Sequence, residues 1–302
     1  MTRVTLRILF ATDGSTGAGQ ALQLLVSSFE PAGTTVEVIS VAPRVGGGPD
    51  AGSTEGPHAL LGQSHRDVAE RHVHGAVERL RSAGFETVET ISAGHPAETI
   101  VTHAIAAEPD LIVLGTRGLG GLRGHVVGSV SGKVARYAQT SVLVARTAGP
   151  IRSVLLGYDA SPDADEALEL VSRLPFREET RLTVCSTYDV VRPLSSGLAP
   201  TMVGQVRAAY ADSLRWAREA AEAMAEVAAE RLHERGATTT HRTARGPAHQ
   251  QLAVVASELS ADLLVVGSRG LSAIQRFFLG STSAALVTQP PTSVLVARRI
   301  GG

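Results

Sequence analysis

The chain has 302 residues, a formal net charge of −1 at pH 7 and 43% hydrophobic residues, which is enough material for two domains with separate cores. Lys133 is its one lysine, and its arginines are interspersed with acids, so no basic stripe indicates a nucleic-acid partner. No window reaches about 18 uninterrupted apolar residues and the N-terminus lacks a signal-like apolar run, so we expect a cytoplasmic protein with no membrane partner.

The first half alternates short apolar runs with segments of helical period. An apolar run at 7–12 ends at the turn formers Asp13, Gly14 and Ser15, where a helix begins. A loop is expected at 43–62, because that stretch is rich in Gly, Pro and Ser and has no period. The other predicted elements are strands at 35–41, 87–91, 110–114 and 141–145, and helices at 18–29, 63–84, 97–107 and 131–138.

The second half repeats this pattern after a joint at Gly149 and Pro150. Residues 94–146 match 246–298 without a gap, and both halves end on the same seven letters, TSVLVAR. The repeat predicts two domains, 1–148 and 149–302. The recurring and extra elements are strands at 153–158, 181–187 and 261–267, a loop at 190–204 and a long helix at 210–235.

Strands that alternate with helices are typical of parallel sheets with right-handed crossovers. We therefore predict an α/β protein with two tandem, Rossmann-like doubly wound domains, each a five-stranded, mostly parallel sheet flanked by helices. Ligands of such sheets bind beyond the carboxyl ends of the strands, where the winding reverses. Asp13, Val41 and the glycines after Leu114 are all expected at that edge.

A spaced set of glycines follows the fourth strand of each half. Glycine after a buried strand lets the backbone approach a ligand, and a Gly-Ser pair opening a helix offers free N–H groups to an anion. This pattern indicates a phosphate site, and an Asp at the end of the first strand can accept hydrogen bonds from ribose hydroxyls or cap a helix. The residues are Gly115, Gly118, Gly128 and Ser129 in the first half and Gly267, Gly270, Gly280 and Ser281 in the second, with Asp13 and Asp159 as the acids.

Two better-known phosphate motifs do not fit. The stretch 128–134 is one residue short of a Walker A loop and lacks Ser or Thr after Lys133. The stretch 118–124 fails the spacing of a dinucleotide fingerprint and follows the fourth predicted strand rather than the first. Neither motif is therefore assigned.

Over essentially its whole length the chain resembles the universal stress protein family in its tandem form. The family's ATP-binding pattern is Gly, two residues, Gly, nine residues, Gly, then Ser or Thr, and both halves match it. The resemblance implies an adenine nucleotide alpha hydrolase-like fold, ATP as the cofactor with or without Mg²⁺, and a dimeric stress-response or signalling module. Little fast catalysis is expected, since no catalytic base or metal-carboxylate pair is visible. The alternative is an ATP-using enzyme, either a slow ATPase or an adenylyl or phosphoryl transferase.

The resemblance also implies roles for individual residues. In the first half it assigns ribose and adenine contacts to Asp13, the adenine pocket to Val41 and Leu114, ribose and α-phosphate approach to Gly115 and Gly118, and the phosphates to Gly128, Ser129 and Val130. The matching positions in the second half are Asp159, Thr187, Val266, Gly267, Gly270, Gly280, Ser281 and Thr282. Thr187 departs from the apolar Val41, and Ala160 stands where Gly14 follows Asp13.

The resemblance further implies that the final strand of each half pairs two domains, either within the chain or in a homodimer. Arg117 and Arg269 occupy equivalent places in the two glycine-rich loops. We expect each of them either to bind a phosphate of the nucleotide or only to line the opening of the binding site.

The remaining candidates have simpler interpretations. His65, His72 and His74 are interpreted as a solvated helix face rather than a metal site, since no second pair of ligands has metal spacing. The helix around Trp216 is expected to pack over its own sheet. Cys185 lies in an apolar alternation and is interpreted as a buried, inert thiol.

Overall fold

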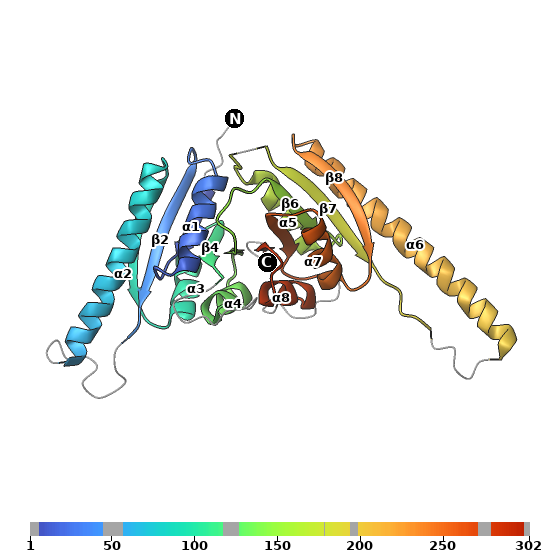
Figure 1. The fold of residues 1–302 in the computed structure, drawn as a ribbon, viewed down its shortest axis with the longest axis horizontal. Helices are drawn as coiled ribbons and strands as arrows, with labels where there is room; N and C mark the ends of the chain where they lie inside the picture. The colour runs from blue at the N-terminus through green and yellow to red at the C-terminus, as the bar shows by residue number, and fades with distance from the viewer. Residues whose placement is uncertain are drawn as a thin grey trace.

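The computed structural model describes residues 6–44, 57–116, 127–177, 179–193, 199–270 and 279–298 (Figure 1). The first half consists of β1 (Leu6–Ala11), α1 (Thr16–Ser28), β2 (Thr34–Ala42), α2 (Pro57–Ser82), β3 (Glu86–Ala93), α3 (Pro96–Ala107), β4 (Leu111–Gly115), α4 (Ser129–Tyr137) and β5 (Ser141–Ala145). The second consists of β6 (Ser153–Gly157), α5 (Pro162–Arg173), β7 (Arg181–Tyr188), α6 (Pro200–His233), β8 (Thr238–Arg245), α7 (Ala248–Glu258), β9 (Leu263–Gly267), α8 (Ser281–Thr288) and β10 (Ser293–Ala297).

The strands form one continuous sheet with the order β3-β2-β1-β4-β5-β10-β9-β6-β7-β8. Pairing is parallel within each half, and the two halves meet through the antiparallel pair β5 and β10. In each half the winding reverses between the first strand and its fourth-strand neighbour, as predicted for a doubly wound fold. Because β5 and β10 each have a neighbour on both sides, the final strands pair within the chain and leave no edge there for a second copy.

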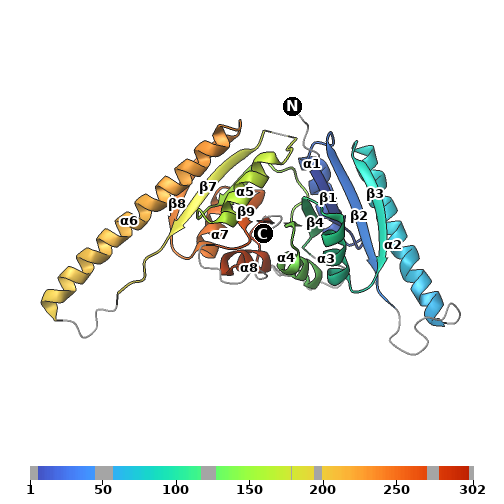
Figure 2. The same cartoon turned by 180° about the vertical axis from the view of Figure 1, so that it is seen from behind.

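Helices cover both faces of this sheet. α1, α2, α5 and α6 pack on one face, where Ile8 and Phe10 point, and α3, α4, α7 and α8 pack on the other, where Leu9 points. The central strands are therefore buried on both sides, which is why their sequences read as uninterrupted apolar runs rather than as alternations. Figures 1 and 2 show α2 and α6 as the outermost helices, on opposite flanks of the molecule.

Two buried or half-buried arginines fasten the halves together at the central pair. Arg298, just after β10, donates to Ala135 O at 2.5 Å and to Thr140 O at 3.4 Å, around the carboxyl end of α4. Burial lowers the pKa of Arg298 to about 10, so the guanidinium is still charged at neutral pH and complements the negative end of the helix. Arg146, its counterpart after β5, donates to Pro290 O.

A second joint lies at the carboxyl ends of α1 and α5. The rings of Phe29 and Phe176 stack with their centroids 5.7 Å apart, and Arg177 Nε donates to Phe29 O at 2.7 Å. The main-chain N–H of Ile151 donates to Ser28 Oγ at 3.1 Å, directly before β6 begins. The chain segment between the halves is thereby held against the first half.

Two predicted loops are shorter than the sequence indicated. α2 begins at Pro57 and α6 at Pro200, in stretches expected to be loops to 62 and 204. Proline is tolerated in the first turn of a helix, where its missing N–H would have no helical partner, so here it opens a helix rather than ending one.

The helix that carries Trp216 packs over its own sheet, against β7 and β8, as predicted. Its buried residues lie in the later part of α6 and include Ala221, Ala225, Ala228 and Leu232. Trp216 itself is 68% exposed. Figure 1 shows the start of α6 extending past β8, because the sheet is too short to cover all 34 residues of the helix.

Candidate functional site

In each half the predicted site residues that the structure describes lie at one edge of the sheet. β1 lies between β2 and β4 and runs parallel to both, so Asp13, Val41 and Gly115 all lie at or just beyond carboxyl ends of adjacent strands. Leu114 is buried at the end of β4, and Val41 is half-buried at the end of β2. The second half repeats this arrangement with its own equivalents, namely Asp159, Thr187, Val266 and Gly267.

The two aspartates brace the turn that leads from strand to helix. Asp13 Oδ1 accepts from the Ser15 N–H at 3.0 Å, and Asp159 Oδ1 accepts from the Ser161 N–H at the same distance. The helix caps are the serines: Ser15 Oγ accepts from Ala18 N–H, and Ser161 Oγ from Ala164 N–H. The helix-cap interpretation of the aspartates is therefore wrong. The second oxygen of each carboxylate, Oδ2, takes no part in the hydrogen bond that braces the turn.

The residue after each aspartate has a left-handed backbone. Gly14 has a φ of +71° and Ala160 a φ of +58°, a region that costs an L-residue about 1–2 kcal/mol. A Cβ on Gly14 would also lie 2.2 Å from Nε2 of His72, which is half-buried against this turn. Glycine at position 14 avoids the backbone strain and leaves room for the His72 ring, whereas the second half tolerates alanine with strain.

Gly115 and Gly267 are glycines because a helix packs on them. A Cβ on Gly115 would lie 2.3 Å from the carbonyl of Gly17 in α1, and one on Gly267 would lie 2.6 Å from the carbonyl carbon of Asp163 in α5. Backbone cannot give way as a side chain can. Close helix-strand packing is thus a second reason for these two glycines, which sequence reasoning missed, and their close approach to a ligand stays a prediction.

Gly270 brings the second glycine loop to the first-strand aspartate. A Cβ on Gly270 would lie 2.6 Å from Oδ2 of Asp159, although the two residues are far apart in sequence. The predicted convergence of loop and acid is therefore present in the second half. The corresponding Gly118, together with Arg117, lies outside the described residues.

Hydrogen bonds join the strand end before each glycine loop to the helix after it. The carbonyl of Thr116 accepts from the N–H of Gly128 and from Ser131 Oγ at 3.3 Å. In the second half the carbonyl of Ser268 accepts from the N–H of Gly280 at 2.8 Å and from Ser283 Oγ at 2.8 Å. These bonds hold the amino ends of α4 and α8 beside the ends of β4 and β9.

The first turns of α4 and α8 present polar groups to solvent. The cap residues Gly128 and Gly280 have no side chain and make no side-chain cap hydrogen bond to the first N–H groups of the helix. Ser129 and Ser281 are exposed, and Val130 and Thr282 are half-buried. An uncapped helix start with an adjacent hydroxyl suits an anion.

A buried ion pair in the second half escaped prediction from sequence. Asp163, only 4% exposed in the first turn of α5, accepts from Arg269 Nε at 3.0 Å, from Arg269 Nη2 at 3.1 Å and from Ser268 Oγ. Burial alone raises the pKa of Asp163, but the hydrogen bonds from Arg269 and Ser268 outweigh it and hold the pKa below the usual range. The sequence feature that could have indicated this ion pair is the acid-rich stretch DASPDAD, which leads into α5.

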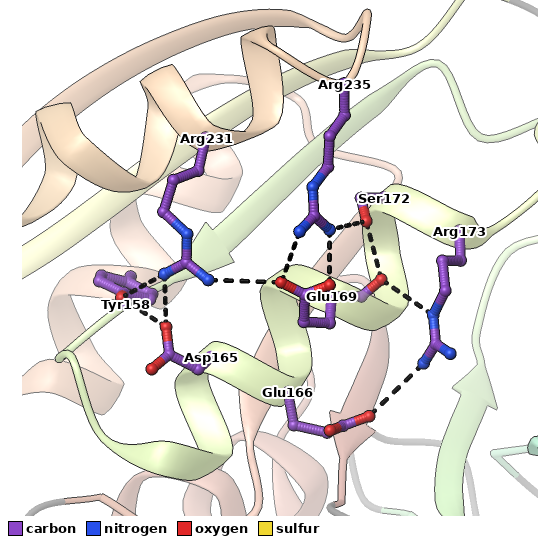
Figure 3. Close-up of polar contacts among 8 residues, drawn as sticks. All are labelled: Tyr158, Asp165, Glu166, Glu169, Ser172, Arg173, Arg231 and Arg235. Carbon is purple, nitrogen blue, oxygen red and sulfur yellow. Dashed lines mark hydrogen bonds and ion pairs between the residues drawn. The ribbon is translucent and has the colours of Figure 1, made fainter.

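A second polar network lies between α5 and α6 and includes Tyr158, the residue that follows β6 (Figure 3). Tyr158, directly before Asp159, donates from its hydroxyl to Asp165 Oδ1 at 2.8 Å, and Arg231 Nη1 donates to the same oxygen at 2.6 Å. Arg235 forks onto the carboxylate of Glu169 at 2.6 and 2.7 Å. Burial, with the Asp165 hydrogen bond, raises the pKa of Tyr158 to about 12, so the phenol stays protonated near neutral pH.

The histidine and cysteine interpretations have different outcomes. His65 and His72 are half-buried rather than on a solvated face, and Nδ1 of His65 is buried without a hydrogen-bond partner among the described residues. Within the described ranges no three His, Cys, Asp or Glu side chains gather in the way that metal ligands do. Cys185 is buried as predicted, and burial raises the pKa of its thiol to about 11. No helix of the described chain is long and apolar enough to cross a membrane.

Comparison with known proteins agrees with this architecture. The chain is 25% identical to universal stress protein Rv1996 of Mycobacterium tuberculosis over 98% of its own length and 96% of the relative's. It is 27% identical to universal stress protein YxiE of Bacillus subtilis, which aligns over 98% of its length to 46% of this chain. A solved universal stress protein from Archaeoglobus fulgidus superposes with a TM-score of 0.65 at 19% identity and covers 98% of this chain and 99% of its own. The model of the universal stress protein family matches residues 5–146 and 150–298, so the chain belongs to the universal stress protein family, with one copy in each half.

Proposed function

We propose that this universal stress protein is an ATP-binding module of a stress response, whose conformation or partner affinity changes with nucleotide occupancy. The observation that carries the proposal is the meeting of Gly270 with the Oδ2 side of Asp159 at the edge where the α8 helix begins uncapped. An acceptor for ribose hydroxyls and donors for phosphates then lie at one strand edge.

The remaining site residues fit the same ligand. Leu114 and Val266 are buried at the ends of β4 and β9, next to the strands that carry the aspartates, and provide an apolar floor for a base. Ser129 and Ser281 add an exposed hydroxyl at each helix start. Asp13 and Asp159 would bind the ribose. The first turns of α4 and α8 would bind the phosphates, and the glycine caps have no side chain that the phosphates would have to displace.

The test places a negative charge where the phosphates are proposed to lie. Ser129→Glu and Ser281→Glu leave the helices intact, because an acid in the first turn favours the positive end of the helix. Repulsion of the bound phosphates is expected to weaken ATP binding by at least about tenfold at the altered half. Isothermal titration of the full chain with ATP measures the affinity and the number of sites.

Matched controls carry the same charge at the other end of the same helices. Gln139→Glu and Gln289→Glu alter exposed residues just after α4 and α8 and should leave ATP affinity within about twofold. The proposal fails if the wild-type chain shows no heat of ATP binding, or if the serine and glutamine variants bind ATP equally.

A further inference from the structure

Arg269, the arginine of the second glycine loop, is already hydrogen-bonded within the protein. Its guanidinium forms a two-pronged ion pair with Asp163, at 3.0 and 3.1 Å, and its main-chain carbonyl accepts from Ser161 Oγ at 3.2 Å. Asp163 is buried, whereas the Arg269 side chain is 31% exposed. Two-pronged arginine-carboxylate pairs are strong and fix the direction of the guanidinium plane. Moving Arg269 to another anion would leave a buried carboxylate unpaired, which is costly.

The first half has no carboxylate at the position that corresponds to Asp163. Gly17 stands at the position of Asp163, and Thr116 and Arg117 stand at the positions of Ser268 and Arg269. The first turn of α1 carries no acid, while that of α5 carries two. The two halves therefore differ in charge next to the helix and loop that the proposed phosphates would approach.

Asp165, the other acid in the first turn of α5, does not compete with Asp163 for Arg269. Asp165 pairs with Arg231 of α6 at 2.6 Å and accepts from the Tyr158 hydroxyl, on the side of α5 that faces α6 (Figure 3). Each acid of the turn thus has its own arginine. This separation makes Asp165 a matched control for Asp163, with the same charge in the same helical turn.

We propose that Asp163 is a specificity-determining residue: by holding Arg269, it makes the second half bind nucleoside polyphosphates more weakly than the first, while leaving the recognition of adenosine unchanged. The inference rests on the proposed nucleotide-binding function. Its physical basis is local charge, since the pair is neutral as a unit and the nearby carboxylate repels a polyphosphate. A ligand without phosphates meets neither effect.

The experiment measures ATP at one half at a time in the full chain, with adenosine as the reference. The Ser129→Glu variant leaves the second half to bind ATP, and the Ser281→Glu variant leaves the first, whereas adenosine carries no phosphate for the glutamate to repel and reports both halves of either variant. The ratio of ATP affinity to adenosine affinity, from isothermal titration, is expected to be at least about tenfold higher in the Ser281→Glu chain than in the Ser129→Glu chain. This comparison requires no change at Asp163, so it does not depend on the folding of a variant there.

Variants at the pair then identify the cause. In the Ser129→Glu chain, Asp163→Asn should raise ATP affinity about tenfold and leave adenosine affinity unchanged, because Arg269 is released. Adding Arg269→Gln should remove the gain. Asp165→Asn, the matched control, should give no gain, and thermal unfolding of each variant shows that it is folded.

Three results would overturn the inference. These are equal ATP-to-adenosine ratios in the two halves, a gain that persists in the Asp163→Asn, Arg269→Gln double variant, and an equal gain from Asp165→Asn. If the wild-type chain binds no ATP at either half, the proposed function itself fails and the inference fails with it. If ATP binds but the ratios are equal, only the inference fails.

Discussion

The joint between the first two helices is a hydrogen bond from an arginine to an amide in one half and a set of arginine-carboxylate ion pairs in the other. In the first half, Arg79 of α2 donates to the amide oxygen of Gln23 in α1 at 2.7 Å. In the second, Arg231 and Arg235 of α6 bind carboxylates of α5, with Glu169 at the position of Gln23. The repeat has kept the packing of the helix pair while changing the chemistry that holds it.

The same contrast extends to the nucleotide edge. The first half has Gly14 and Gly17 where the second has Ala160 and Asp163, so at these two positions the second half has a strained backbone and a carboxylate in a buried ion pair, whereas the first half has glycines. Each replacement lies within a few residues of a proposed ligand-binding aspartate. Duplication of a fold therefore does not imply duplication of a binding property, and the two halves must be measured separately.

The largest expected effect concerns a feature that the halves share. Gly115→Ala should destabilise the chain by about 3 kcal/mol, because the new Cβ would overlap the backbone of α1, and Gly267→Ala should act similarly against α5. Gly19→Ala, on the exposed side of α1 with nothing within 4 Å, is the control and should be neutral or stabilising. Denaturant unfolding measures all three. A Gly115 variant as stable as the Gly19 variant would contradict the packing explanation.

A smaller effect is expected at the arginines that join the halves. Arg298→Met should cost about 2 kcal/mol, because it leaves buried carbonyls around the end of α4 without their donor. Arg146→Met should cost less, because that side chain is only half-buried. Chemical denaturation of the two variants gives the difference. Equal losses would mean that the joint is symmetric in energy as well as in sequence.

The strained turn predicts opposite effects of exchanging Gly and Ala. Ala160→Gly should stabilise the chain by about 1 kcal/mol by removing the cost of a left-handed alanine. Gly14→Ala should destabilise it by more than that, since the new methyl group would also meet His72. Thermal melting distinguishes the two signs, and a destabilised Ala160→Gly variant would rule out strain at this turn.

The smallest expected effect is a difference in acid sensitivity at the two helix joints. The hydrogen bond from Arg235 lowers the pKa of Glu169, and at Asp165 the bonds from Arg231 and Tyr158 outweigh burial and lower the pKa as well. A lowered folded-state pKa stabilises above the unfolded value, near pH 4, and this contribution is lost as the pH falls through the folded value. Gln23 does not titrate. The contribution is at most about 1 kcal/mol, because these side chains are partly exposed.

Hydrogen exchange at a series of pH values checks this difference. Between pH 5 and about pH 2, amides at the joint of α5 and α6 should lose protection before those at the joint of α1 and α2. The Glu169→Gln variant, which gives the second half the first half's side chain, should reduce the difference. Parallel loss of protection at both joints in the wild-type chain would contradict it.

The sequence alone determined the order of elements and the pairing of each predicted strand with a helix. The run Ser141–Ala145 is a strand as predicted, because a strand buried on both faces needs a continuous apolar run, and that requirement is local. The repeat likewise placed Asp13 and Asp159 at strand ends. Helix starts were missed at Pro57 and Pro200, since the same residue types open a helix or form a loop.

Only the tertiary structure decided how distant residues meet. The joining of the halves through β5 and β10 was left open between one chain and two, because an apolar strand does not specify its partner. The contact of Asp163 with Arg269 spans 106 positions, and the overlap of Gly115 with α1 depends on where a helix axis crosses a strand. Spacing along the sequence encodes neither, because both depend on how helices and strands distant in sequence are packed in three dimensions.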